Sequence, residues 1–409
     1  MAISRPKNSR RRRGLALVIV ALAVIYAGLV LVLPVKALSS PQASSTLAIT
    51  TPPSNLPWPQ NSESAVGIVG SGVIATHGPQ TPRAIASNAK LITALAVLKK
   101  YPLVLGQQGP MITLGSTDYA IYTKYISEQG SVVPVYNGEQ LSEYQMLEAM
   151  LVPSGDNIAD SLARWAFGSI SSYINYANEL VKQLGLNNTH VGGDASGLSP
   201  DTTSTASNLI MLGADAMANP VIAQIVAMKS VDVPNVGVMN NYDTILGTDG
   251  IVGIKTGNSN QAGGIFLGAA DSSVNGHPVT ILTAVMGAPS LNQALSDSVP
   301  LVISLENDFN ETVLINKGEV VGEYREPWGG YVQILAGSNL DTYVIQGQTV
   351  KVKLSLKALA VPSVVGSSVG TATSNSSEFS PAVSIPLVTE QGTTEPSLIW
   401  RLSNPGAIF

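Results

Sequence analysis

A serine and a lysine three residues apart, Ser87 and Lys90, stand at the start of a segment with helical composition. Residues at positions i and i+3 share one face of a helix, so the lysine amine can approach the serine hydroxyl. A serine becomes a nucleophile when a base takes its proton, and a lysine serves as that base when burial and nearby cations favour its neutral form. The backbone N–H of Ser87, at the helix N-terminus, is then free to face a developing oxyanion.

This S-x-x-K pattern is weak evidence by itself. About one match is expected by chance in a chain of this composition, and Ser4 to Lys7 matches as well. That copy precedes a long apolar segment and has no predicted core around it, so we set it aside. Taken alone, an ordinary helix cap is the simpler interpretation of Ser87.

A rarer pattern, Lys255-Thr256-Gly257, closes an apolar strand, and about 0.1 chance occurrences are expected. The ammonium and hydroxyl of the first two residues can bind a substrate carboxylate. The glycine lets a substrate lie against the strand edge, and the next residue, Asn258, is placed to donate a second oxyanion N–H. The competing interpretation is a strand that simply ends in a glycine turn.

The segment Ser154-Gly155-Asp156-Asn157 lies between these two patterns and precedes a predicted helix. Ser154 could relay a proton between Lys90, Lys255 and a leaving group. Asp156 or Asn157 could hydrogen-bond Lys90 or a substrate amide. The same residues are also good helix N-cap chemistry, so the segment gains weight only from its position between the other two.

The elements that must position these residues are predicted from the spacing of apolar side chains. Helices are expected over 88–100, 141–151, 158–167, 170–184, 205–217, 220–228 and 290–305. A strand pair is expected over 65–76, and strands over 250–255, 263–270 and 279–286. Strand, helices, then strands indicate an α+β domain over 63–308, with helices packed on an antiparallel sheet. Short β-rich runs then predict a small all-β domain over 309–409, without an evident amphipathic helix at the chain end.

The N-terminal region predicts a membrane anchor. Residues 1–13 hold six Lys or Arg side chains and are expected to form a cytoplasmic tail, followed by a transmembrane helix over 14–34. A Ser-, Thr- and Pro-rich linker over 35–62 would then hold an extracytoplasmic domain away from the membrane. Cleavage as a signal peptide is the alternative, but the apolar run is longer than the about 7–15 residues usual for such peptides.

Composition excludes several classes of site. The chain has no cysteine and three histidines, so thiolate chemistry and Cys-based metal sites are excluded, and no HExxH motif occurs. Outside the N-terminal tail, the chain has 16 basic and 27 acidic residues. That balance disfavours nucleic acid as a partner.

The ordered set S-x-x-K, an S-x-N-like turn and K-T-G resembles that of the penicillin-recognising serine enzymes. The segments SNAKLITALAVL, MLVPSGDNIADSLA, GGDASGLSPDTTSTASNL and GIVGIKTGNSNQAGG resemble the low-molecular-weight D-alanyl-D-alanine carboxypeptidases from about residue 65 to 305. The resemblance implies a penicillin-binding fold with an accessory C-terminal domain. It also implies cleavage of peptidoglycan stem peptides that end in D-Ala-D-Ala, acylation by β-lactams, and no metal or cofactor.

The resemblance implies that Ser87 is the acylated nucleophile and Lys90 its base, with Ser154 in the second motif and Lys255, Thr256 and Gly257 in the third. Two departures matter. The second motif reads Ser-Gly-Asp-Asn in place of the usual Ser-x-Asn, and Gly287 to Ser298 lacks the arginine that many members use to grip the terminal carboxylate. A β-lactamase or esterase on the same fold, or a non-catalytic cell-wall-binding or β-lactam-sensing protein, are therefore the alternatives.

Overall fold

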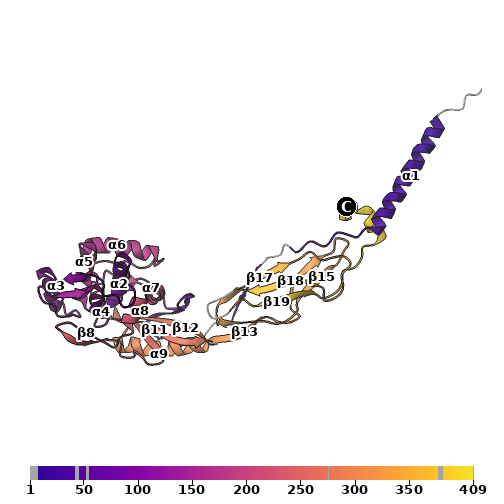
Figure 1. Ribbon diagram of the computed structural model, residues 1–409. Helices are drawn as coiled ribbons and strands as arrows, with labels where there is room; N and C mark the ends of the chain where they lie inside the picture. The colour runs from indigo at the N-terminus through magenta and orange to yellow at the C-terminus, as the bar shows by residue number, and fades with distance from the viewer. Residues whose placement is uncertain (1–7, 42–45, 52–54, 275, 376–380, 409) are drawn as a thin grey trace, which may run out of the picture. The chain divides into compact units, whose positions relative to one another are not determined.

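The computed structural model describes residues 8–41, 46–51, 55–274, 276–375 and 381–408. The chain divides into two compact units (Figure 1). One comprises residues 52–310 with 345–348 and holds the candidate site. The other comprises residues 1–51, 311–344 and 349–409.

The first unit is built on a five-stranded antiparallel sheet with the strand order β10-β11-β12-β2-β3. Its strands are β2 (Glu63–Ile68), β3 (Gly72–His77), β10 (Ile251–Ser259), β11 (Gly263–Val274) and β12 (His277–Ala288). Residues 65 and 66 of β2 and nearly all of residues 265–270 of β11 are fully buried. Both faces of the sheet centre are therefore covered, while β10 stands at an edge.

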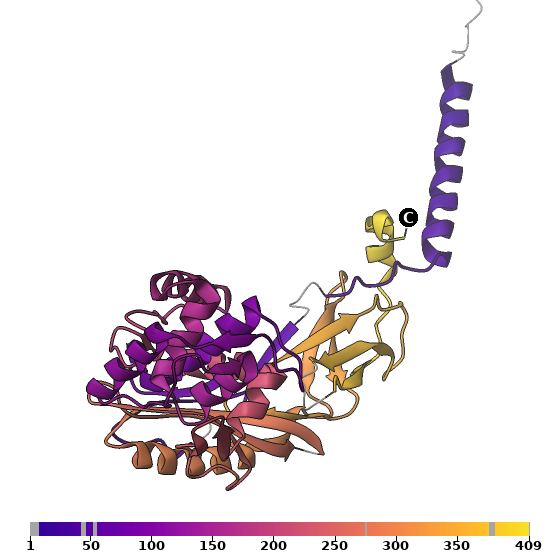
Figure 2. The same ribbon diagram turned by 60° about the vertical axis from the view of Figure 1, so that its left-hand side comes forward.

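Helices cover the two faces of this sheet. Helix α9 (Leu291–Asn307) packs on β11 and β12, whereas α7 (Ala206–Ala218) packs on β2, β3 and β12. Figure 2 shows α9 on one side of the sheet and the larger helical layer on the other. That layer also contains α2 (Ala89–Lys100), α3 (Ser116–Ser127), α4 (Glu143–Leu151), α5 (Asp156–Phe167), α6 (Ile170–Gln183) and α8 (Pro220–Val226). The predicted α+β class is confirmed.

Several elements of this unit were not predicted. Helix α3 has only one fully buried side chain, Tyr125, so its apolar spacing gives little signal. Short strand pairs also occur outside the main sheet: β4 (Arg83–Ala84) with β7 (Thr203–Ser204), β5 (Met111–Thr113) with β6 (Gln140–Ser142), and β8 (Ser230–Val233) with β9 (Gly237–Asn240). The β4–β7 pair matters for the site, because β4 ends at Ala84, two residues before Ala86 and three before Ser87.

The second unit contains a six-stranded sheet with the order β1-β17-β18-β19-β15-β14 and a pair formed by β13 and β16. Their bounds are β1 (Thr46–Thr50), β13 (Phe309–Ile315), β14 (Val320–Arg325), β15 (Tyr331–Ala336), β16 (Leu340–Ile345), β17 (Thr349–Leu356), β18 (Ser368–Ser374) and β19 (Ser384–Thr389). Strand β1 comes from the segment predicted as a linker, and pairs antiparallel with β17. Residues 46–50 are thus part of a sheet, while residues 42–45 and 52–54 of that segment lie outside the described residues.

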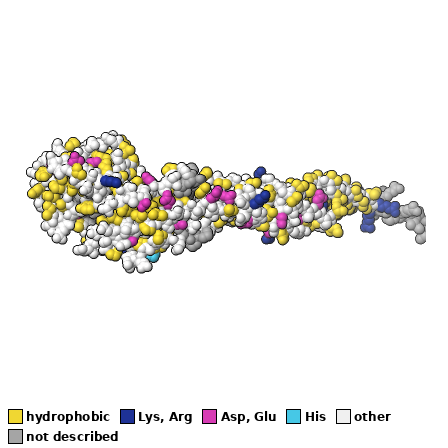
Figure 3. Space-filling view, turned by 90° about the horizontal axis from the view of Figure 1, so that it is seen from below, with side chains coloured by type: hydrophobic (Ala, Val, Ile, Leu, Met, Phe, Trp, Pro, Cys, Tyr) yellow, Lys and Arg dark blue, Asp and Glu magenta, His cyan; other side chains and the backbone are white. Residues whose placement is uncertain are grey.

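Helix α1 (Asn8–Val32) precedes these strands, and residues 1–7 of the predicted cytoplasmic tail lie outside the described residues. Its span from Arg11 to Val32 is long and apolar enough to cross a membrane. Figure 3 shows apolar side chains along this helix and basic side chains at its N-terminal end. The chain end forms a six-residue helix, α10 (Leu398–Ser403), where none was expected. The Arg401 side chain donates to the carbonyl oxygens of Val30 and Leu33 and so caps the C-terminus of α1.

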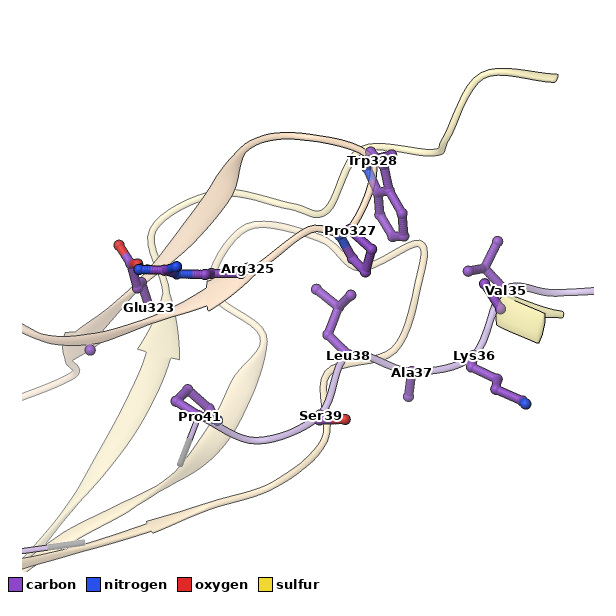
Figure 4. A pocket seen from close by; sticks show the side chains of 12 residues that line it. Val35, Lys36, Ala37, Leu38, Ser39, Pro41, Glu323, Arg325, Pro327 and Trp328 are labelled. Carbon is purple, nitrogen blue, oxygen red and sulfur yellow. The ribbon is translucent and has the colours of Figure 1, made fainter. Parts of the chain in front are cut away.

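A mainly apolar groove lies in this second unit, between the segment 35–41 and the end of β14 with the turn that follows (Figure 4). Leu38, Pro327 and Trp328 form part of its wall, with Glu323 and Arg325 along one side. The residues with catalytic motifs all belong to the first unit, so this groove is separate from the candidate site.

Candidate active site

Ser87 lies in one turn of 3₁₀ helix, Ala86–Asn88, which leads directly into α2. Ala86 has a φ of 46°, in the left-handed region, and this sharp turn leaves the Ser87 side chain half-buried while both its neighbours are buried. The turn is enclosed by glycines, since a Cβ at Gly257 would lie 2.7 Å from Asn88 Nδ2 and one at Gly197 would lie 2.0 Å from the Ala86 carbonyl oxygen. The backbone of β10 therefore passes close to Ser87.

The amine of Lys90 is fully buried and makes three hydrogen bonds. Its Nζ donates to Ser87 Oγ at 2.8 Å, to Asp156 Oδ1 at 2.6 Å and to the Ser196 carbonyl oxygen at 3.0 Å. These acceptors come from three separate segments and hold the amine within proton-transfer distance of the serine hydroxyl.

The two candidate residues of the second motif face different partners. Asp156 binds Lys90 through Oδ1, and its Oδ2 accepts from the Ser131 backbone N–H at 2.7 Å. The Asn157 side chain instead accepts from the Val133 N–H at 3.0 Å and donates to the Val133 carbonyl at 2.8 Å. Asp156 is thus the residue that contacts Lys90, whereas Asn157 fixes Val133 beside α5.

Ser154 occupies the turn between α4 and α5. Its φ is 62°, and only 3% of the residue is exposed. The turn is tightly enclosed, because a Cβ at the following residue, Gly155, would lie 2.7 Å from the Ala149 carbonyl oxygen. The geometry holds Ser154 beside the N-terminus of α5, which also carries Asp156.

Lys255 and Thr256 are buried on β10, and Asn258 is exposed at the end of the same edge strand. Burial, and then the neighbouring Lys90, lower the pKa of Lys255 to about 7, although Asp156 and Asp243 act in the opposite direction. Both protonation states of Lys255 are therefore populated near neutral pH. An arriving carboxylate would favour the charged form and be bound by it.

A polar pocket continues from the end of β10 and includes Asn258. Its walls come from α3 and the residues after it (Lys124, Glu128, Gln129), from the segment 193–199 (Gly193, Asp194, Leu198, Ser199), and from the end of β10 with the turn that follows it (Ser259, Asn260, Gln261). It offers hydrogen-bond donors and acceptors to an extended polar ligand.

The segment 193–199 was not assigned a role from the sequence, although its residues form part of the family resemblance. Its only signal was the Gly- and Ser-rich composition of a loop. Gly287 begins the segment that lacks the arginine found in many family members. Another arginine lies beside it, because a Cβ at Gly287 would lie 2.3 Å from Arg83 Nη1. Among the described residues, no group of three His, Asp or Glu side chains could hold a metal ion.

Comparisons with known proteins identify the family to which this chain belongs. The family model of peptidase S11, D-alanyl-D-alanine carboxypeptidase, matches residues 61–290, more than half of the chain. The D-alanyl-D-alanine carboxypeptidase DacA of Haemophilus influenzae is 24% identical over 56% of this chain and 60% of its own length. A D-alanyl-D-alanine carboxypeptidase of a Streptomyces species is 26% identical over 56% of this chain and 80% of its own length.

Solved structures show the same fold. Penicillin binding protein 5 from Haemophilus influenzae superposes with a TM-score of 0.58 at 21% identity, over 83% of this chain and all of that one. The Streptomyces K15 DD-transpeptidase superposes with a TM-score of 0.54 at 22% identity, over 61% of this chain and 98% of that one. Taken with the match of the family model to residues 61–290, the chain belongs to the D-alanyl-D-alanine carboxypeptidase family, peptidase S11.

Proposed function

We propose that this protein is a serine-type D-Ala-D-Ala carboxypeptidase that trims peptidoglycan stem peptides and is acylated by β-lactams. The observation that carries the proposal is the 2.8 Å contact between Lys90 Nζ and Ser87 Oγ beside the Lys-Thr-Gly edge strand. A buried amine at this distance is placed to take the serine proton. The family relationship supplies the substrate class.

The reaction follows from these positions. Ser87 Oγ attacks the carbonyl carbon of the bond between the two D-alanines, and its proton passes to Lys90. The C–N bond then breaks, and the proton reaches the leaving amine of D-alanine through Ser154. Water cleaves the resulting ester and restores the hydroxyl of Ser87, so each cycle consumes one water and releases one D-alanine.

Substrate binding is assigned to the edge strand. Lys255 and Thr256 would bind the terminal carboxylate by charge and hydrogen bond. Gly257 lets the peptide lie against β10, while the N–H groups of Ser87 and Asn258 would face the oxyanion. Asp156 would lie beside the substrate amide, but as a carboxylate it accepts hydrogen bonds and cannot donate one.

The direct test incubates the full-length protein in detergent with a fluorescent penicillin and, separately, with a peptide that ends in D-Ala-D-Ala. We expect covalent labelling and D-alanine release by the unmutated protein, and neither by Ser87→Ala. If the unmutated protein is not labelled, the proposed function is wrong. Labelling without D-alanine release would favour a slowly deacylating β-lactam sensor.

We further propose that α1 anchors the protein in the cell membrane as a single span, with the catalytic unit on the extracytoplasmic side. Its 22-residue span from Arg11 to Val32, which is long and apolar enough to cross a membrane, supports the anchor. The basic residues Arg11–Arg13 at its N-terminal end support the orientation, because such residues stay on the cytoplasmic side. Protease added outside intact spheroplasts should digest the catalytic unit. Protection of that unit until the cells are lysed would contradict the orientation.

A further inference from the structure

A largely buried loop, residues 194–199, hydrogen-bonds Lys90 and packs against Ala86, the residue before Ser87. The carbonyl oxygen of Ser196 accepts from Lys90 Nζ at 3.0 Å. Gly197 has a φ of 80° and lies so close to Ala86, next to the nucleophile, that no side chain would fit there. The position of the 194–199 loop therefore determines where the amine of Lys90 and the turn of Ser87 lie.

The loop has an internal carboxylate at its centre. Asp194 Oδ1 accepts from the N–H groups of Ser196 at 2.8 Å and Gly197 at 2.6 Å, and its Oδ2 accepts from Ser199 N–H at 2.7 Å. Ser196 Oγ also donates to Asp194 Oδ1 at 2.9 Å. These bonds shape the loop, but they are all internal and do not attach it to the helices.

Asp160 of α5 is one of the groups that attach the loop to the helices, beside Lys90 and a 3.4 Å contact of Ser196 Oγ with the Tyr125 hydroxyl. Its Oδ1 accepts from the Ala195 N–H at 2.9 Å, and its Oδ2 accepts from the hydroxyl of Tyr125 on α3 at 2.9 Å. A second attachment comes from α2, where Thr93 Oγ1 donates to the Ala195 carbonyl at 2.7 Å. Asp160 is 5% exposed and Tyr125 fully buried. A single carboxylate thus ties the loop to two helices in a region closed to water.

We propose that Asp160 is a positioning residue for the catalytic pair: through Ala195 it fixes the 194–199 loop, and through the Ser196 carbonyl the loop holds Lys90 against Ser87. This proposal rests on the proposed acylation of Ser87. Asp160 makes no hydrogen bond to the nucleophile or to Lys255 and Thr256, which are assigned to the substrate carboxylate, so its effect on the reaction is exerted through the loop.

The ionisation of Asp160 gives this role a signature. Burial raises the pKa of Asp160 to about 6; Asp194 on the loop also raises it, while the Ala195 N–H, Tyr125 and Lys124 act in the opposite direction. Tyr173 on α6 is the other titratable group that interacts with it. When Asp160 is protonated, its Oδ2 becomes a donor and the bond from Tyr125 must reverse. The attachment of the loop should therefore weaken as the pH falls through about 6.

The test compares Asp160→Asn and Asp160→Ala in the full-length protein, with the rate of labelling by a fluorescent penicillin measured from pH 5 to 8. Asparagine keeps an acceptor for Ala195 and a donor for Tyr125 but does not titrate. We expect Asp160→Asn to label within about threefold of the unmutated rate at pH 7.5 and to lose the decline near pH 6. Asp160→Ala should label about 10- to 100-fold more slowly at every pH, because the amine is misplaced.

Asp215→Asn is the matched control, since Asp215 is a half-buried aspartate on α7 whose pKa burial also raises. It should keep both the rate and the pH profile of the unmutated protein. Circular dichroism melting shows whether each variant is folded. An unmutated rate in folded Asp160→Ala, or an unchanged acid decline in Asp160→Asn, overturns the inference. Absence of labelling in the unmutated protein would instead remove the proposed function.

Discussion

Replacement of Asp156 by asparagine tests how the unusual second motif affects catalysis. The Asp156 carboxylate lies 2.6 Å from Lys90 Nζ, and both side chains are almost fully buried. As a base, Lys90 must direct a lone pair at Ser87, whereas the Asp156 carboxylate only accepts hydrogen bonds and binds the N–H donors of the amine. In Asp156→Asn, Oδ1 can still accept from Ser131 N–H while Nδ2 can donate to the amine of Lys90.

The size of the effect follows from the strength of the hydrogen bond between Asp156 and Lys90. A hydrogen bond to a charged group contributes about 1.5–3 kcal/mol, which corresponds to about 10- to 100-fold in a rate. Asp156→Asn should therefore label with a fluorescent penicillin about 10- to 100-fold faster at pH 7.

Single-turnover labelling from pH 6 to 10 measures this difference directly. Asp232→Asn removes an exposed carboxylate from β8 and serves as the charge control; it should label at the unmutated rate. A slower or unchanged rate in Asp156→Asn would refute the reasoning. A slower rate would mean that the Asp156 carboxylate assists the transfer of the Ser87 proton, and an unchanged rate that it has no part in it.

Three further variants test the surrounding structure. Lys255 has a pKa of about 7 in the folded protein and an ordinary value of 10.5, so between these pH values the unfolded chain binds more protons and the free energy of unfolding should rise with pH. In Lys255→Met, urea unfolding should show no such rise. A rise that persists in the variant would contradict the assignment to Lys255. Asn157→Ala leaves both backbone groups of Val133 unpaired and should lower the free energy of unfolding by about 2–5 kcal/mol. A decrease in this free energy below about 1 kcal/mol would indicate that water replaces the amide. Gly197→Ala places a Cβ 2.0 Å from the Ala86 carbonyl at a φ of 80° and should abolish penicillin labelling; a labelling-competent variant would show that the loop can move away from Ser87 without consequence.

The fold class and the motif residues could be predicted because each depends on local pattern. Apolar spacing identifies α2, α4 and α5, which bury six or more side chains each. Apolar spacing does not identify α3, because only Tyr125 of this helix is fully buried. Strand β1 was missed because its side chains alternate between exposed and half-buried and its stability depends on pairing with β17, which no local pattern reports.

The site required side-chain directions that spacing does not give. Asp156 and Asn157 are adjacent in sequence, yet one faces Lys90 and the other Val133. Their directions depend on the turn at Ser154, whose φ is 62°. The contribution of Asp160 was equally hidden, because it depends on the contact between α5 and a loop more than 30 residues later.

The central claim is that Ser87 is the acylated nucleophile of a D-Ala-D-Ala carboxypeptidase. Mass spectrometry of the penicillin-treated protein, after proteolysis, measures this directly. We predict a single penicilloyl adduct on the peptide that contains Ser87, blocked by prior incubation with a D-Ala-D-Ala peptide and absent from Ser87→Ala. An adduct on any other residue, or no adduct on folded unmutated protein, would contradict the account.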